Sequence, residues 1–199
     1  MQKRNPEPIE DELGRLLPFR GGHFRYESGH HSGKWLDLET LFLHPERVEP
    51  LAHALSDRMT GYAIDVVCGP LVEGAFVALM IARRLHVPFT YTERVASPAG
   101  KMYGVQYRLP QTLRDVVRGK RVAIVNDVTS AGSAVRGTYA DLLECNATPV
   151  VIGTLALLGD ATLHFAADHH IPLETLGTFP NEIWRPDECP LCARGIALT

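Results

Sequence analysis

Residues 121–136 have the sequence Arg121-Val-Ala-Ile-Val-Asn-Asp-Val-Thr-Ser-Ala-Gly-Ser-Ala-Val-Arg136. The unbroken apolar run Val122–Val125 predicts a buried parallel strand. Asn126 and Asp127 follow it, and the short loop Thr129–Ser133 leads into a stretch with apolar residues at helical spacing. A strand, a polar loop and a helix start in this order present successive backbone N–H groups to an anion. The stretch therefore predicts an α/β unit with an anion site after the strand.

The side chains of this loop suit a phosphorylated sugar. Gly132 allows the backbone to come close to an anion, and the Thr and Ser hydroxyls around it add hydrogen-bond donors. Asp127 can accept hydrogen bonds from sugar hydroxyls, as acidic residues do in nucleotide-binding folds. An ordinary strand–turn–helix is the alternative, because Ser, Thr and Gly also cap helices. In an ordinary turn, the full pattern of residues 121–136 would have arisen by coincidence. A phosphorylated ribose, in contrast, would make use of every part of the loop.

The stretch closely resembles the phosphoribosyl-pyrophosphate (PRPP) signature of the type I phosphoribosyltransferases. In that signature an apolar run and two acidic residues precede an apolar-Thr-x-x-Gly-Ser/Thr loop. The resemblance implies that Asn126 and Asp127 hold the ribose hydroxyls, with Asp127 also among the catalytic residues. Asn126 departs from the first acid of the signature, so one charged ribose contact is lost. The residues implied to cradle the 5′-phosphate are Thr129, Ser130, Ala131, Gly132 and Ser133.

The implied fold class is α/β, a type I phosphoribosyltransferase fold with a parallel core sheet flanked by helices. A small hood would come from N- and C-terminal segments, about residues 20–40 and 178–199. The remaining periodicity agrees, because strands and helices alternate. The expected helices are 45–60, 75–85 and 160–170, and the expected strands are 63–68, 88–91, 149–158 and 171–176. Within residues 1–20, one possible helical face carries Ile9, Leu13, Leu16 and Leu17.

Composition bounds the class of protein. The 199 residues are 45% hydrophobic and 22% charged, which predicts one globular domain rather than a disordered chain. The net charge of −3 gives no reason to expect nucleic-acid or membrane partners. Without an apolar run of membrane-spanning length or a signal-peptide core, a cytoplasmic location is expected. The four cysteines have uneven spacings that do not form a secreted disulfide framework.

A second strand–loop–helix unit precedes the central one. Its expected strand, Ala63–Cys68, ends in a Gly-bounded loop, and a run of apolar helical residues follows. Loops at the carboxyl ends of parallel strands are where such sheets bind ligands. By the resemblance this is the pyrophosphate loop, with Gly69, Pro70 and Gly74 contacting PRPP.

Residues 93–104 have the Pro, Gly and Ser content of a surface loop. They resemble the catalytic lid of orotate phosphoribosyltransferases, which has an Arg-Lys start and a later Lys-x-His-Gly. Arg94 matches the arginine and Lys101 the later lysine, whereas Val95 and Tyr103 depart from the pattern. The resemblance implies that Arg94 and Lys101 are catalytic and neutralise the departing pyrophosphate. A surface loop with two solvated charges is the alternative.

The hood segment resembles that of the orotate enzymes, where a Ser-Gly-x-x-Ser turn precedes an aromatic-rich strand near the base. Ser28 and Trp35 are therefore expected to contact the base. Glu27 stands where that family has a lysine, which reverses a charge. The adjacent His30 and His31 favour a solvated turn or a substrate contact over a metal site.

The C-terminal tail could fold back over the site, with Trp184 stacking on the base, or it could pack against the domain without a role in binding. Where the orotate enzymes read the pyrimidine with an arginine, this chain has Leu158. Cys189 and Cys192 form one C-x-x-C with no second pair to complete a zinc site. Two inert thiols are favoured, a redox pair or a site shared across a dimer being the alternatives, and no metal-ligating residue is predicted.

The reaction implied by the resemblance is displacement of pyrophosphate from PRPP by a nitrogenous base, through an oxocarbenium-like state. Mg²⁺ would be held mainly by PRPP itself, and a homodimer is expected because the family's lid often serves the neighbouring subunit. An orotate-type enzyme of pyrimidine biosynthesis is the first hypothesis. The alternatives are an enzyme for another base, such as a purine, and a non-catalytic PRPP sensor.

Overall fold

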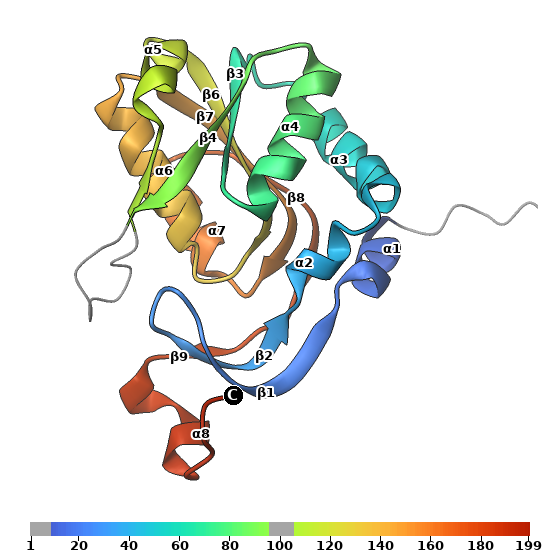
Figure 1. Ribbon diagram of the computed structural model, residues 1–199, viewed down its shortest axis with the longest axis vertical. Coiled ribbons are helices and arrows are strands. Elements are labelled where there is room, and N and C mark those ends of the chain that lie inside the picture. The colour runs from blue at the N-terminus through green and yellow to red at the C-terminus, as the bar shows by residue number, and fades with distance from the viewer. Residues whose placement is uncertain (1–8, 96–105) are drawn as a thin grey trace, which may run out of the picture.

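A six-stranded sheet forms the centre of the protein in a computed structural model that describes residues 9–95 and 106–199 (Figure 1). The strand order is β5-β4-β3-β6-β7-β8, and only β5 is antiparallel to its neighbour. The strands are β3 (Val66–Pro70), β4 (Phe89–Val95), β5 (Gln106–Arg108), β6 (Arg121–Thr129), β7 (Thr148–Leu158) and β8 (Leu173–Phe179). The expected α/β class with a parallel core sheet is confirmed.

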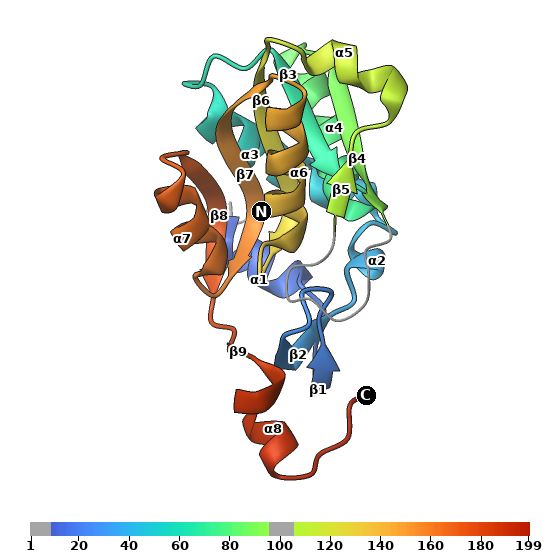
Figure 2. The ribbon, with the colours of Figure 1, turned by 90° about the vertical axis from the view of Figure 1, so that its left-hand side faces the viewer.

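Helices cover both faces of this sheet (Figure 2). On one face lie α1 (Ile9–Leu16), α3 (Pro45–Met59) and α4 (Glu73–Leu85), and on the other α5 (Arg114–Val117), α6 (Ser133–Glu144) and α7 (Ala161–Asp168). Side chains of β6 alternate between the two layers, since Ala123 and Val125 belong to the first core and Val122 and Ile124 to the second. The central run is apolar throughout because both of its faces are buried.

A smaller sheet forms the hood, defined here as β1 (Phe19–Arg25), β2 (His31–Leu36) and β9 (Ile183–Trp184). Both of its strand pairings are antiparallel. The short helix α2 (Leu38–Leu41) leads from the hood to the main sheet, and η2 (Pro186–Glu188) and α8 (Pro190–Ala193) follow β9. The hood built from the two ends of the chain is therefore confirmed.

The central strand is longer than the sequence predicts. Its pairing with β7 continues from Asn126 opposite Thr154 to Thr129 opposite Leu157. Asn126 and Asp127 are consequently strand residues, and the loop shrinks to Ser130–Gly132. The sequence predicts a shorter strand because polar side chains follow the apolar run at Val125. Strand β7 nevertheless pairs with the backbone as far as Thr129. Strands β5 and β9 were not predicted, because each has only two or three residues.

Within residues 9–95 and 106–199, no helix has both the length and the apolar character needed to cross a membrane.

Candidate functional site

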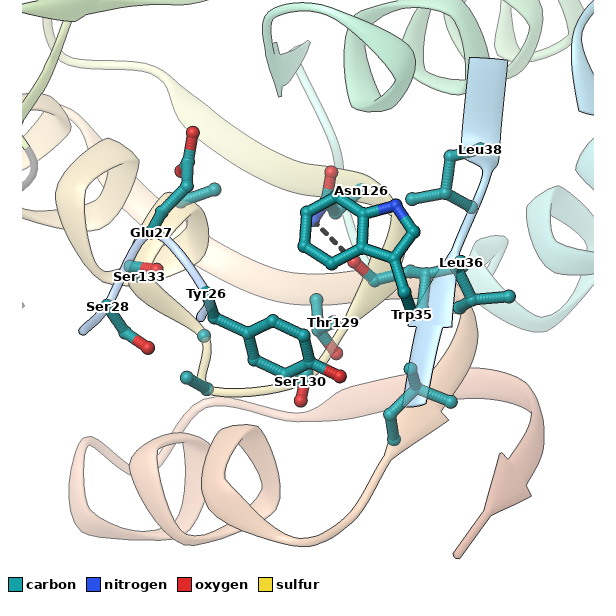
Figure 3. Close-up of a pocket in the computed structure, with 15 residues that line it drawn as sticks. Tyr26, Glu27, Ser28, Trp35, Leu36, Leu38, Asn126, Thr129, Ser130 and Ser133 are labelled. Carbon is teal, nitrogen blue, oxygen red and sulfur yellow. Dashed lines mark hydrogen bonds between the residues drawn. The ribbon is translucent and has the colours of Figure 1, made fainter. Parts of the chain in front are cut away.

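A cavity lies between the hood and the end of β6 (Figure 3). Its volume is about 220 Å³, which suits a small ligand. The cavity sits at the carboxyl ends of the parallel strands, the usual ligand position in such sheets. Its lining residues are Tyr26, Glu27, Ser28, Trp35, Leu36, Leu38, Asn126, Val128, Thr129, Ser130, Ala131, Gly132, Ser133, Ala134 and Leu158.

The turn after β6 forms one wall of this cavity. Gly132 has φ +77°, and a Cβ atom there would lie 2.9 Å from Thr162 Oγ1. Glycine is thus required by both the backbone conformation and the space. Helix α6 begins at Ser133, so its unpaired first N–H groups and positive dipole end meet the cavity. The turn therefore has the strand–loop–helix geometry that the sequence predicts, and anion binding at it stays a prediction.

Two hydroxyl groups beside this turn have no protein partner. Within the described part of the chain, Thr129 Oγ1 and Thr162 Oγ1 are buried without a hydrogen bond. A buried donor left unsatisfied costs roughly 1–3 kcal/mol, which a bound phosphate oxygen would offset. Thr162 was missed by sequence reasoning because it belongs to the next α/β unit and carries no motif.

Asn126 is fixed against the neighbouring unit. Its side-chain amide donates to the carbonyl oxygen of Val128 at 3.0 Å. A Cβ atom at Gly74 would lie 2.1 Å from Asn126 Oδ1, and one at Gly69 would lie 2.6 Å from the carbonyl oxygen of Gly74. These glycines therefore let strand β3, helix α4 and Asn126 approach closely. Gly69, Pro70 and Gly74 do not line the cavity, and their role in binding pyrophosphate stays a prediction.

Asp127 is a buried carboxyl group whose Oδ2 atom has no hydrogen-bond partner among the described residues. Burial raises its pKa to about 7, against an opposing backbone hydrogen bond from Val128, and the nearby charge of Glu73 adds to the rise. A strongly shifted carboxyl near a cavity is a typical feature of functional sites. Asp127 does not itself line the described cavity, because it alternates with Asn126 and Val128 along the strand.

Arg94 lies at the end of β4 and reaches the hood. Its Nη1 atom is 3.0 Å from Oε1 of Glu27, whose other carboxylate oxygen accepts a hydrogen bond from the Tyr107 hydroxyl at 3.0 Å. Burial raises the pKa of Tyr107, so its phenol remains a donor. These contacts link β4 and β5 to the hood beside the cavity. Lys101, the other expected lid residue, lies outside the described residues.

Asn181 connects the tail, the hood and the turn. Its amide nitrogen donates to Ser130 Oγ at 3.1 Å and to Tyr26 Oη at 3.2 Å, and its carbonyl oxygen accepts from Ser32 Oγ at 3.1 Å. Sequence reasoning missed both Asn181 and Tyr26. Tyr26 adjoins the hood motif and could have been included on that ground, whereas only the fold places Asn181.

The two tryptophans expected at the base occupy different places. Trp35 lines the cavity and lies beside Tyr26, with 5.9 Å between ring centroids (Figure 3). Trp184 lies in β9 opposite His31 and is not part of the lining. Ser28 lines the cavity and its Oγ is 2.9 Å from His30 Nδ1. The structure thus brings Ser28 and Trp35 to the cavity, and a Trp184 contact stays a prediction.

Comparison with known proteins gives consistent matches. A family model described as "Phosphoribosyl transferase domain" matches residues 38–171. The chain is 30% identical to the orotate phosphoribosyltransferase of Wolinella succinogenes over 98% of this chain and 95% of that protein.

Solved structures with similar folds include two kinds of transferase. An adenine phosphoribosyltransferase from Trypanosoma brucei has a TM-score of 0.69 at 17% identity, covering 87% of this chain and 81% of the other. The orotate phosphoribosyltransferase from Aeropyrum pernix has a TM-score of 0.63 at 20% identity, covering 85% and 93%. At these identities the two structures support the fold alone.

Proposed function

This chain belongs to the phosphoribosyltransferase family, and from that premise we propose that it transfers ribose 5-phosphate from PRPP to orotate, releasing pyrophosphate. The observation that carries the proposal is the turn Ser130–Gly132, where a left-handed glycine and the start of α6 meet the cavity. Orotate is the proposed base because relatives that match nearly the whole chain carry that enzyme's name.

The 5′-phosphate would bind at this turn. The free N–H groups at the start of α6 and the positive end of the helix dipole favour an anion. The hydroxyls of Thr129, Ser130 and Ser133 lie around the same point, and Thr129 lacks another partner within the described residues. Phosphate binding here would place the sugar toward Asn126 at the end of β6.

A Mg²⁺ ion would be held mainly by oxygen atoms of PRPP and by water, since oxygen ligands are those that Mg²⁺ prefers. Asp127, whose Oδ2 atom has no partner in the described chain, is assigned to the ribose hydroxyls rather than to the ion. When bound, the ion would neutralise charge on the departing pyrophosphate. Asp127 would ionise more readily as it accepts hydrogen bonds from ribose hydroxyls, since such bonds favour the charged form.

We assign Arg94 and Lys101 to the departing pyrophosphate. Charge builds on this group as the bond from the sugar breaks, and fixed cations stabilise it best where water is excluded. For this role, Arg94 would have to break its ion pair with Glu27 and bind pyrophosphate instead. The homodimer and the cytoplasmic location remain part of the proposal, because they follow from family resemblance and composition alone.

The base would lie against Trp35. Leu36, Leu38, Val128 and Leu158 give this part of the lining an apolar character. Glu27 would repel an anionic base, and more strongly once Arg94 leaves the ion pair for pyrophosphate. A purine is the second candidate, because Leu158 offers no hydrogen bond to a pyrimidine carboxylate and an aromatic, apolar wall suits a larger base.

A base panel tests the proposal. The protein is incubated with PRPP, Mg²⁺ and either orotate, uracil, adenine or hypoxanthine, and pyrophosphate release is measured. Release with orotate at the highest kcat/KM is expected. Pyrophosphate release only with a purine would support the transferase reaction and show that the base is a purine rather than orotate. PRPP binding without release for every base would instead favour the sensor.

A further inference from the structure

We propose that His23, His31, Cys189 and Cys192 form a structural Zn²⁺ site that fastens the C-terminal segment to the hood. One nitrogen or sulfur atom from each residue lies within 4.8 Å of the others. His23 belongs to β1 and His31 to β2, whereas Cys189 precedes α8 and Cys192 lies within it. None of the four lines the cavity described above.

The spacing of the four atoms suits a tetrahedral ion. His23 Nε2 is 3.1 Å from His31 Nδ1, 3.4 Å from Cys189 Sγ and 3.8 Å from Cys192 Sγ. Cys192 Sγ is 3.3 Å from His31 Nδ1. Zinc bonds of about 2.0–2.1 Å to nitrogen and 2.3 Å to sulfur place tetrahedral ligands roughly 3.3–3.8 Å apart. These four separations lie close to those that such an ion imposes, and every pair of ligand atoms lies within 4.8 Å.

The orientation of His23 supports this assignment independently. Its Nδ1 atom is 2.6 Å from the carbonyl oxygen of Ile196, which can only accept a hydrogen bond. Nδ1 therefore carries the proton, and the lone pair of Nε2 points into the cluster. A histidine that binds a metal usually donates its other N–H in this way, often to a backbone carbonyl.

The ligand set selects zinc over the divalent cation of the reaction. Two imidazoles and two thiols favour a soft or borderline metal, whereas Mg²⁺ prefers oxygen ligands. Four protein ligands fill a tetrahedral shell and leave no open position, which is the arrangement of structural rather than catalytic zinc. Both cysteines are free thiols in the structure.

Among the described residues, the C-terminal segment is held to the hood mainly by polar contacts with His23, from Ile196 and Thr199. Of residues 185–199, only Cys189 is buried, so apolar packing contributes little there. Its direct backbone tie to the hood is the Thr199 N–H, which donates to the carbonyl oxygen of His23 at 2.8 Å. Figure 1 shows this end of the chain beside β1. Metal ligation would therefore supply much of the free energy that orders the segment.

This site also bears on the cavity through the hood. His31 pairs with Trp184, and the same strand, β2, carries Trp35 to the cavity wall. Zinc would thus join β1 and β2 to the segment that follows β9, and β2 is the hood strand that carries Trp35 to the cavity. From the sequence alone, the adjacent histidines and the single C-x-x-C did not predict a metal site, because no motif marks the fourth ligand, His23.

The test is the metal content of the untagged, full-length protein, purified without chelator and measured by inductively coupled plasma mass spectrometry. About one zinc ion per chain is expected for a closed four-ligand site. Cys192→Ser is the first variant, because Cys192 is exposed and its replacement should leave the fold intact. This variant and His23→Ala should both lose stoichiometric zinc.

Matched controls separate the site from other thiols and histidines. Cys145→Ala and His53→Ala alter residues outside the cluster and should retain the zinc of the wild type. Cobalt added to metal-stripped wild type should give the visible absorption of a tetrahedral site with thiolate ligands, and Cys192→Ser should lack it. The proposal is overturned if the wild type stays without zinc after exposure to it, if Cys192→Ser binds as much, or if mass spectrometry finds Cys189 and Cys192 in a disulfide.

Discussion

Arg94 and Glu27 form an ion pair across the edge of the cavity, with 3.0 Å between Nη1 and Oε1. The two side chains are 58% and 42% exposed, so solvent screens the pair and its net stabilisation is at most about 1 kcal/mol. A pair of this strength can hold Arg94 near the hood and still release it to a more highly charged partner. Glu27, which departs from the orotate pattern, thus has a defined local role.

Glu27→Gln is expected to strengthen PRPP binding. Removing the carboxylate frees Arg94 for pyrophosphate, and the loss of a pair worth up to ~1 kcal/mol predicts a decrease in the Kd for PRPP of up to about fivefold. Isothermal titration calorimetry measures this. The gain should vanish when Arg94→Ala is present in both proteins; a gain that persists would show that Glu27 acts without Arg94.

Arg94→Ala is expected to slow turnover more than it weakens binding. If the guanidinium acts on charge that develops as pyrophosphate leaves, kcat should fall by on the order of tenfold or more, with a much smaller change in the Kd for PRPP. Steady-state kinetics and calorimetry together give both values. Arg83→Ala, an exposed arginine on α4, is the control. Unchanged turnover in Arg94→Ala would remove the lid assignment.

Asp127→Asn is expected to stabilise the protein at neutral and higher pH while abolishing turnover. The pKa of Asp127 is raised to about 7 from 3.8, so the folded state binds more protons than the unfolded state between these values. This carboxyl therefore lowers stability progressively as pH rises through that window. The variant should gain on the order of 1–3 kcal/mol in free energy of unfolding near pH 8.

Urea unfolding of both proteins between about pH 5 and pH 8 measures this difference. The gain of the variant over the wild type should grow with pH across that range. A difference that stays constant with pH would contradict the raised pKa of Asp127.

Trp35→Leu is expected to raise the KM for the base. Base–aromatic stacking is worth about 1–3 kcal/mol, so an increase of at least about fivefold is expected, with little change in the KM for PRPP. Trp184→Leu is the matched variant, because Trp184 lies in the hood away from the lining. An equal increase in both variants would support the predicted Trp184 contact, and no increase in Trp35→Leu would exclude stacking on Trp35.

Local pattern was enough to predict the central fold and the turn. The apolar run Val122–Val125 and Gly132 specify their surroundings through burial and backbone conformation, and both are properties of a few neighbouring residues. Contacts that join distant segments were not predictable. Asn181 reaches Ser130, and Cys189 reaches His23, only because the tail returns to the hood. The family resemblance implied that return, but nothing in the sequence indicated which side chains would meet there.

Gly132 offers a clean test of the turn. A valine there must adopt φ +77° and would place its Cβ atom 2.9 Å from Thr162 Oγ1, so it should close the phosphate site. Gly119→Ala is the matched control. Gly119 has φ +68°, but a Cβ atom there would have open space. Both variants should lose stability through backbone strain, of order 1–3 kcal/mol. Only Gly132→Val should lose the ability to bind PRPP.

The central claim, that the 5′-phosphate of PRPP binds at the turn after β6, is tested most directly by calorimetric titration of PRPP with Mg²⁺ into these proteins. The wild type and Gly119→Ala should bind PRPP with similar Kd, and folded Gly132→Val should show no binding. Unchanged PRPP affinity in Gly132→Val would contradict the placement of the phosphate.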